Sequence, residues 1–269
     1  MLSRTSVAFG LVASSLFAIQ AQATVLLDVD FESGYTLGDL NGQTGGTVGG
    51  NWNAPWTTGS TQKVVVSSPA LGSKAASASR DNGGDSYTSV DLAAPQLDTS
   101  LSSIYYSFDF YRGDDNDHGL ITLYNKNSGN NTGLGVSIPT GASPTLDLIT
   151  AGGFATSATT YQLENSKWYR VEFEANGATD QYNAYIQKQG VSGRTQIGTN
   201  VAWSAPNGIV TSFLYYAQGL TESNIVVDNL YLETGATFPV DRPLAVPEPA
   251  ALSLLGLAAL FPLRRRSKR

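Results

Sequence analysis

The sequence contains no cysteine and only one histidine, His118, in 269 residues. The lack of cysteine excludes disulfides, thiol catalysis, cysteine-ligated zinc and iron–sulfur clusters. A single histidine excludes metal sites built from several histidines, and a Ser-His-Asp enzyme would need His118 as its base. We interpret His118 as a turn residue. Stability must therefore come from an apolar core, from a bound metal ion, or from both.

Positive charge is scarce in residues 24–245, where 10 Lys and Arg stand against 21 Asp and Glu. An acidic surface of this kind argues against nucleic acid and anionic lipid as partners. It is compatible with divalent cations and neutral glycans. The region is long enough for one substantial domain with its own core.

Long apolar runs with a helical period are absent from residues 24–234, and short alternating runs separated by turn residues take their place. Such runs predict an all-β domain, a two-sheet antiparallel sandwich of jelly-roll type. The expected strands are Val25–Glu32, Lys63–Ser67, Lys74–Ser79, Ser86–Leu92, Ser103–Arg112, Gly119–Asn125, Gly133–Ile138, Thr145–Thr150, Lys167–Ala175, Gln181–Lys188, Arg194–Thr199, Ser212–Ala217 and Asn224–Glu233.

Two of these runs alternate most clearly. Ser103–Arg112 places Tyr106 and Phe108 on one face and Asp109 on the other, and we expect it to pair with Gly119–Asn125 across the intervening loop. In Lys167–Ala175, one of Trp168 and Tyr169 must face the core, and alternation favours Tyr169.

The first 23 residues have the layout of a secretory signal peptide. One positive charge, Arg4, precedes an apolar, helix-compatible stretch, and Ala21-Gln22-Ala23 fits the small-x-small cleavage rule. We expect a signal helix, cleavage by signal peptidase after Ala23, and a mature chain that begins at Thr24.

The C-terminal end has three parts after a linker at 235–245. A polar tetrapeptide comes first, then 14 apolar residues at 250–263, then a terminal basic cluster. The apolar part is shorter than the roughly 20 residues of a permanent membrane span. We expect a short hydrophobic helix that holds the chain at the membrane transiently, with the basic cluster on the cytoplasmic side. A simple membrane anchor is the alternative.

Together, residues 246–269 resemble the PEP-CTERM sorting signal of Gram-negative bacteria. The resemblance implies recognition and removal of the tail by exosortase, and hence a final location at the cell surface or in the extracellular matrix. The residues that carry the tetrapeptide and the basic cluster are Val246, Pro247, Glu248, Pro249, Arg264, Arg265 and Arg266.

Residues 24–234 resemble the laminin-G-like and concanavalin A-like sandwich superfamily. The resemblance lies in the segments 30–35, 167–171 and 227–230. It implies that the first and last strands are neighbours and that Glu32 and Asp228 hold a structural calcium ion, because calcium takes oxygen ligands. Asp28 or Asp30 could contribute. The alternative is that these acids simply point to solvent. The resemblance also favours Trp168 as the core residue, whereas alternation favours Tyr169, so the choice between the two stays open.

Two further groups of residues are candidates for binding. The acidic loop between Arg112 and Gly119 could chelate calcium, although a solvated hairpin loop is the better interpretation. Aromatic rings with a polar handle suit stacking on sugars, or they fill the core and the strand surfaces. The aromatic candidates are Tyr105, Tyr111, Trp52 and Trp56.

Catalytic motifs are missing from the sequence. It has no nucleophile elbow, phosphate loop or dinucleotide fingerprint, and Glu172-Phe173-Glu174 lacks the Glu-x-Asp-x-x-Glu pattern of glycosidases with this fold. We therefore expect a non-catalytic surface or matrix protein associated with exopolysaccharide. A lectin-like carbohydrate-binding module is the first alternative, and a divergent polysaccharide hydrolase or lyase is the second.

Overall fold

The computed structural model describes residues 23–52, 62–65, 74–80, 86–94, 97–98, 103–125, 130–150, 156–203, 209–217, 223–235 and 237–238. Strands and turns make up these residues. In this part of the chain, no helix is long and apolar enough to cross a membrane. The expected signal helix and the expected helix near the C-terminus lie outside the described residues.

The larger of two main sheets has nine strands among the described residues, all paired antiparallel. In spatial order they are β14 (Thr195–Ala202), β13 (Gln181–Lys188), β12 (Lys167–Asn176), β7 (Ile104–Arg112), β17 (Ser223–Thr234), β4 (Ala75–Arg80), β3 (Gln62–Val65) and β2 (Gly38–Asp39), with β1 (Thr24–Val29) also paired to β17.

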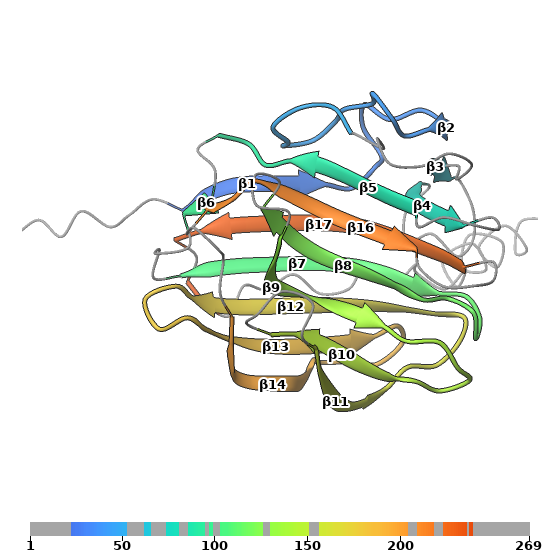
Figure 1. The fold of residues 1–269 in the computed structure, drawn as a ribbon. Helices are drawn as coiled ribbons and strands as arrows, with labels where there is room; N and C mark the ends of the chain where they lie inside the picture. The colour runs from blue at the N-terminus through green and yellow to red at the C-terminus, as the bar shows by residue number, and fades with distance from the viewer. Residues whose placement is uncertain are drawn as a thin grey trace, which may run out of the picture.

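The smaller main sheet lies against one face of the larger one (Figure 1). Its strands, in spatial order, are β11 (Thr156–Gln162), β10 (Thr145–Ile149), β9 (Asn130–Ile138), β8 (Gly119–Asn125), β16 (Ser212–Ala217) and β5 (Ser86–Asp91). A two-stranded sheet joins β15 (Ile209–Val210) to β6 (Leu97–Asp98). The predicted all-β, two-sheet antiparallel sandwich is confirmed.

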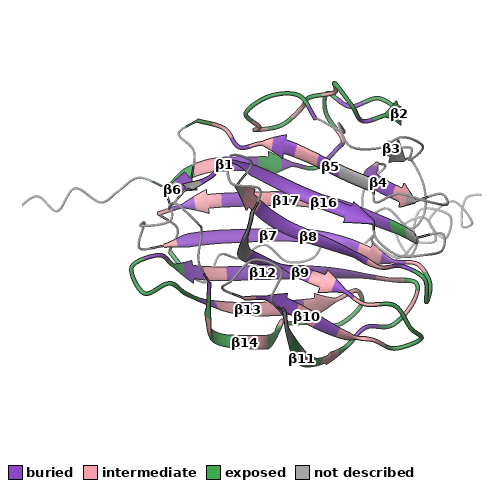
Figure 2. Cartoon of the chain, in the orientation of Figure 1, coloured by how far each residue is buried: buried purple, intermediate pink, exposed green. Residues whose placement is uncertain are grey.

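The core fills the space between the main sheets. On β7, Tyr106, Phe108 and Phe110 are fully buried in it, and they meet Phe213 and Ile121 of the smaller sheet in one apolar cluster. Figure 2 shows that burial extends along the central strands of both sheets. The alternation seen in the sequence therefore identifies the inward face of β7 correctly.

The expected pairing of 103–112 with 119–125 is wrong. β7 pairs with β12 and β17 in the larger sheet, whereas β8 pairs with β9 and β16 in the smaller one. The connecting loop crosses between the layers. Asp117 shapes this crossing, because its carboxylate accepts backbone N–H bonds from Gly113 at 2.5 Å and Asn224 at 3.1 Å.

β17 has two different neighbours on one side. Its first half pairs with β4 up to Val227, and its second half pairs with β1 from Leu230 onward. Asp228 and Asn229 lie where the neighbour changes. First and last strands are thus adjacent, as the resemblance implied, and the change of neighbour brings the segment after β1 toward the middle of β17.

Candidate functional site

The outer face of the larger sheet, turned away from the smaller sheet, carries polar and ionisable side chains on its central strands. Asp228 of β17, Asp109 of β7 and Arg170 of β12 occupy one row across the sheet, because they are paired in register. All three are buried, with exposed fractions of 1%, 0% and 5%. Buried ionisable groups need partners, so their contacts decide what this row can do.

A β-bulge in β17 sets the geometry at Asp228. The register with β7 passes from Asp228 opposite Asp109 to Tyr231 opposite Ser107, which inserts one extra residue. Asn229 takes this place with φ of 49°. Asparagine tolerates the left-handed conformation better than most residues, and bulges next to active sites re-aim side chains.

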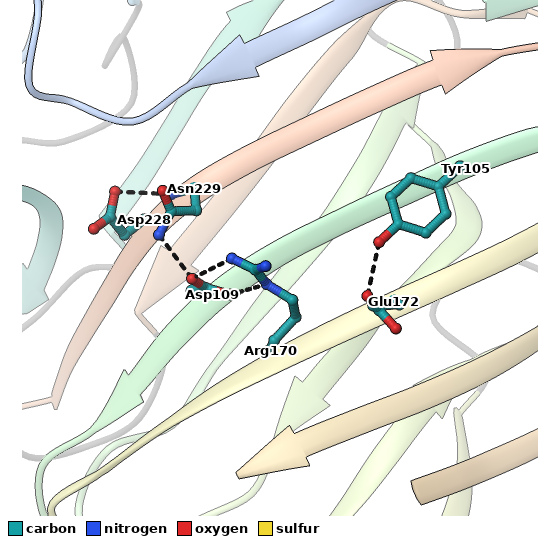
Figure 3. Close-up of polar contacts among 6 residues, drawn as sticks. All are labelled: Tyr105, Asp109, Arg170, Glu172, Asp228 and Asn229. Carbon is teal, nitrogen blue, oxygen red and sulfur yellow. Dashed lines mark hydrogen bonds and ion pairs between the residues drawn. The ribbon is translucent and has the colours of Figure 1, made fainter. Parts of the chain in front are cut away.

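Asp109 is the centre of a hydrogen-bonded group (Figure 3). Arg170 contacts it with two nitrogens, Nε at 2.6 Å to Oδ1 and Nη2 at 2.7 Å to Oδ2. Asn229 donates its side-chain N–H to Oδ2 at 2.8 Å, and its backbone N–H bonds Asp228 Oδ1 at 2.7 Å. The two-nitrogen ion pair supplies the counter-charge for an ionised Asp109. Asn229 bridges the two carboxyl groups.

Among the described residues, Asp228 forms no ion pair, and its ionisation differs accordingly. Burial, followed by the negative charges of Asp109, Glu32 and Asp30, raises its pKa to about 8, although the backbone N–H of Asn229 acts in the opposite direction. At neutral pH, Asp228 is therefore mostly protonated. Two neighbouring carboxyl groups in opposite protonation states can serve as an acid and a base or nucleophile.

The segment after β1 completes the surroundings of Asp228. Phe31 adopts φ of 58°, a rare conformation for a bulky residue, with its ring buried in the core. Glu32 follows, half-buried, and its carboxylate accepts the backbone N–H of Lys74 at 2.9 Å. Lys74 Nζ in turn donates to the carbonyl oxygen of Glu32 at 2.9 Å. The negative charge of Glu32 also lies near enough to Asp228 to raise the pKa of that group.

Two rows further along β12 lies a second polar group. Tyr105 donates its hydroxyl to Glu172 at 2.8 Å (Figure 3). Arg194 of the turn before β14 joins Glu172 at 3.0 Å and Glu174 at 2.7 Å. The Arg194 guanidinium also lies 3.8 Å from the ring centroid of Tyr185. This second group sets two carboxylates against one guanidinium, and it extends the polar outer face toward the sheet edge.

The aromatic candidates have different positions. Trp52 is in the core, 1% exposed, with its Nε1 donating to the Tyr35 hydroxyl at 2.9 Å and its ring against Phe31. Its proposed role in sugar stacking is wrong, because the ring is enclosed between the sheets. Trp56 lies outside the described residues.

Tyr105 and Tyr111 do lie on the outer face of the larger sheet. Tyr105 is buried, and its ring centroid lies 6.1 Å from that of Tyr231. Tyr111 is half-buried, and its ring centroid lies 5.5 Å from that of Trp168. A role for either ring in sugar stacking stays a prediction.

The open choice between Trp168 and Tyr169 is resolved by the structure. Tyr169 belongs to the main core and stacks on Phe110 at 5.3 Å. Trp168 is also fully buried, but on the outer face, in a small cluster with Ala75, Val226 and Tyr111. Alternation was the better guide.

The acidic loop between β7 and β8 does not present its aspartates together. The carboxylate of Asp117 accepts hydrogen bonds from backbone N–H groups, and that of Asp114 accepts one from the backbone N–H of Asn116 at 2.7 Å. Among the described residues, no group of three or more acidic or histidine side chains is placed to hold a metal ion. A calcium ion at Glu32 and Asp228 would have to complete its coordination with backbone oxygens. That site stays a prediction.

Of the residues expected to direct processing, Ala23 and Thr24 are described. Both are exposed, and β1 begins at Thr24, where the predicted cleavage would leave the mature N-terminus. The tetrapeptide at 246–249 and the arginines at 264–266 lie outside the described residues.

Sequence reasoning missed Asp109, Arg170 and Asn229 as site residues. Alternation had assigned Asp109 and Arg170 to outward faces, but only the register between β7 and β12 makes them partners. The Asp-Asn dipeptide in a strand otherwise rich in β-branched and aliphatic residues was the available signal for a bulge.

No family profile and no curated protein sequence matches the chain. Solved structures do match. One is a GH131 β-glucanase catalytic domain from Podospora anserina, with a TM-score of 0.50 and 15% identity, covering 80% of this chain and 97% of that one. Another is a carbohydrate esterase from the Shiga toxin-encoding bacteriophage phi24B, with a TM-score of 0.51 and 15% identity over 80% of this chain and 100% of that one.

At this identity the likeness shows the fold alone. Both matched proteins are enzymes that act on carbohydrates, and this finding contradicts the expectation of a non-catalytic domain. That expectation relied on missing sequence motifs, whereas the paired carboxyls of the outer face come from strands far apart in sequence. What the chain shares with these two structures is the two-sheet β-sandwich fold.

Proposed function

We propose that this is an exported glycan-acting protein that hydrolyses glycosidic bonds with Asp228 as general acid and Asp109 as the second carboxylate. One observation carries the proposal. Two carboxyl groups directly opposite on adjacent strands have environments that separate their protonation states, since Arg170 pairs with Asp109 while burial raises the pKa of Asp228 to about 8. Glycoside hydrolysis needs such a pair.

The chemistry assigns one role to each group. Asp228, protonated, gives its proton to the leaving glycosidic oxygen. Asp109 acts on the anomeric carbon, as nucleophile or through water, and Arg170 and Asn229 keep it oriented. A retaining mechanism needs the two carboxyl groups about 5–5.5 Å apart, and an inverting one needs about 6.5–9.5 Å. The anomeric configuration of the released sugar therefore reports which geometry applies.

Access is a requirement of the proposal. Asp109 and Asp228 are closed to solvent in this structure, so a glycan can reach them only if the outer face opens.

Release of reducing ends from a panel of β-1,3- and β-1,4-linked glucans tests the activity, with the full chain purified from an exporting host. We expect activity to fall as pH rises through about 8, because the acid must keep its proton. Asp228→Asn should abolish activity. Asp147→Asn is the matched control, because Asp147 is a carboxyl of the opposite sheet whose pKa burial also raises.

Retention of activity in Asp228→Asn, or an equal loss in both variants, would contradict the assignment. An unmodified chain that releases nothing from any glucan would also contradict it, once an acetylated glycan and a uronic-acid polymer have been tried as other substrates.

Delivery to the outside of the cell is the second part of the proposal. The signal-peptide layout and the tail support export, removal of residues 1–23, and removal of the segment beyond about Pro249 by exosortase. Mass spectrometry of the protein from an exosortase-competent host reports both termini. Exported protein that still carries Arg264–Arg269 would overturn the second cleavage. The partner expected at the destination is exopolysaccharide.

A structural calcium ion held by Glu32 and Asp228 is a second proposal for the surroundings of Asp228. Its support is the negative charge of Asp109, Glu32 and Asp30 around Asp228, which raises the pKa of Asp228 and which a divalent cation would offset. The two proposals compete, because a calcium-bound Asp228 is ionised and cannot serve as a general acid.

A further inference from the structure

A cavity of about 460 Å³ lies beside the polar outer face, at the end of the larger sheet where β12, β13 and β14 meet their turns. Four residues with side-chain amides line it, together with one carboxylate and two aromatic residues, of which Tyr182 is buried in the core. The residues that the argument uses are Asn176, Gln181, Asn183, Asn200, Glu174 and Phe238. Planar amides beside an aromatic ring are the chemistry of a small polar ligand rather than an apolar one.

Backbone contacts fix the orientation of two of these amides. Asn176 Oδ1 accepts the backbone N–H of Ala178 at 2.9 Å, and Asn183 Oδ1 accepts that of Asn200 at 3.0 Å. Only the amide oxygen can accept, so in each case the NH₂ group is the part left for other contacts. Within the described residues, neither NH₂ group donates a hydrogen bond. The wall therefore carries pre-oriented, unused donors.

A bulge in β14 creates the space for these donors. The pairing of β13 with β14 shifts between Tyr182 and Ala184, and Asn200 on the facing strand has φ of 49°. The Asn183 side chain reaches across this irregularity to the backbone of Asn200. The position of the amide is thus built into the sheet edge.

The charge of the cavity selects among polar ligands. Glu174 is its one carboxylate, and Arg194 pairs with it from outside the wall. Glu174 still offers acceptor oxygens, so a ligand hydroxyl can donate to it and accept from an amide NH₂. An uncharged ligand rich in hydroxyl groups satisfies both, and Phe238, half-buried at the rim, offers an apolar face.

We propose that this cavity binds one uncharged sugar residue of a glycan chain. The ligand class rests on the proposed function, whereas the donor arrangement does not. Arg194 links Glu174 to Glu172 of the outer face, so once the outer face opens, a chain held in the cavity would extend along β12 toward Asp109. Four residues of strand from Glu174 to Arg170 cover about 13 Å.

Isothermal titration calorimetry of the full chain tests whether the cavity binds a sugar. The Asp228→Asn background is used so that no probe is consumed. The probes are cellotetraose, laminaritetraose and mannotetraose, with a tetrasaccharide of uronic acids as the charged comparison. We expect at least one neutral probe to bind, and the charged one to bind at least about tenfold more weakly.

The double variant Asn176→Asp with Asn183→Asp keeps both acceptor oxygens and removes both NH₂ donors. It should weaken binding at least about tenfold. The double control Asn116→Asp with Asn51→Asp adds the same two negative charges at exposed positions that do not line the cavity, and it should leave affinity unchanged. If the double variant melts early, Phe238→Ala replaces it, with the same loss expected.

Unchanged affinity in these cavity variants, or no binding of any probe, would overturn the proposal. If a neutral probe binds but the unmodified chain shows no hydrolysis, the binding proposal is supported and the acid–base assignment is wrong.

Discussion

The two faces of β12 are both buried, yet they are built differently. The inner face presents Tyr169, Val171 and Phe173 to the core, whereas the outer face presents Arg170 and Glu172. Aromatic and aliphatic contacts satisfy the inner face. On the outer face of β12 the charged groups are paired. Arg170 forms an ion pair with Asp109, and Glu172 accepts a hydrogen bond from Tyr105 and forms an ion pair with Arg194.

The two faces place different demands on their side chains. Apolar side chains gain stability from any close-packed arrangement, but a buried charge is tolerated only with an oriented partner. The chemistry proposed above uses the outer face, and the variants below separate its contribution to stability from its contribution to that chemistry.

Truncation of the inner face should have the largest effect. We expect Tyr169→Ala to lower the free energy of unfolding by about 3–5 kcal/mol, because the ring stacks on Phe110 in the main core. Tyr169→Phe, the control, should lose only about 1 kcal/mol, since it removes only the hydroxyl contacts with Glu164. In urea titration, Trp168→Ala should lower the free energy of unfolding by less than Tyr169→Ala does. The reverse order would mean that the outer cluster is the real core.

Breaking the ion pair of the outer face should be nearly as severe. Arg170→Met leaves Asp109 buried without its cation and should destabilise by about 3–5 kcal/mol. Replacing both partners, in Arg170→Met with Asp109→Leu, should recover much of this loss. If the double variant is no better than the single one in thermal or urea unfolding, the charge on Asp109 is not what the arginine compensates.

Calcium should stabilise the protein if Glu32 and Asp228 hold it. Binding at a hundredfold excess over the dissociation constant would add about 2.7 kcal/mol, seen as a rise in the melting temperature that chelator reverses. Glu32→Gln should reduce the rise, while Asp39→Asn, in the same segment, should not. A melting curve that calcium leaves unchanged would remove the metal from this corner.

Asp228 should make stability depend on pH. Its pKa is about 8 in the folded chain and about 3.9 when unfolded, so between these values the folded chain holds a proton that the unfolded chain has lost. The free energy of unfolding should therefore fall as pH rises through this window, by up to about 1.4 kcal/mol per pH unit, and level off above it.

Asp228→Asn should flatten this slope in unfolding titrations between pH 5 and 8. A saturating calcium concentration should flatten it too if the ion binds Asp228, because the bound carboxylate stays ionised. An identical slope in the variant and the unmodified chain would show that Asp228 titrates normally.

Much of the fold could be predicted because alternation is a local property. β8, β13 and β16 have the expected bounds, alternation identified the inward face of β7, and the inward face of β12 is the one that alternation favoured. β11 was missed because Thr156–Gln162 is a polar strand at the sheet edge, with too few apolar residues to alternate. The pairing of β7 with β8 was wrong because adjacency in sequence does not decide whether a chain turns back within a sheet or crosses to the other layer.

Sequence by itself determined most of the strand content and the alternation of side chains along the strands, and it carries the motifs of the two ends, since these depend on residue types within a few positions. Only the tertiary structure decided that Asp109 meets Arg170 and Asp228, because the three residues come from strands about 60 positions apart that the sheet register brings together. The raised pKa of Asp228 has the same origin: burial and the neighbouring acids exist only once β1, β7 and β17 are adjacent.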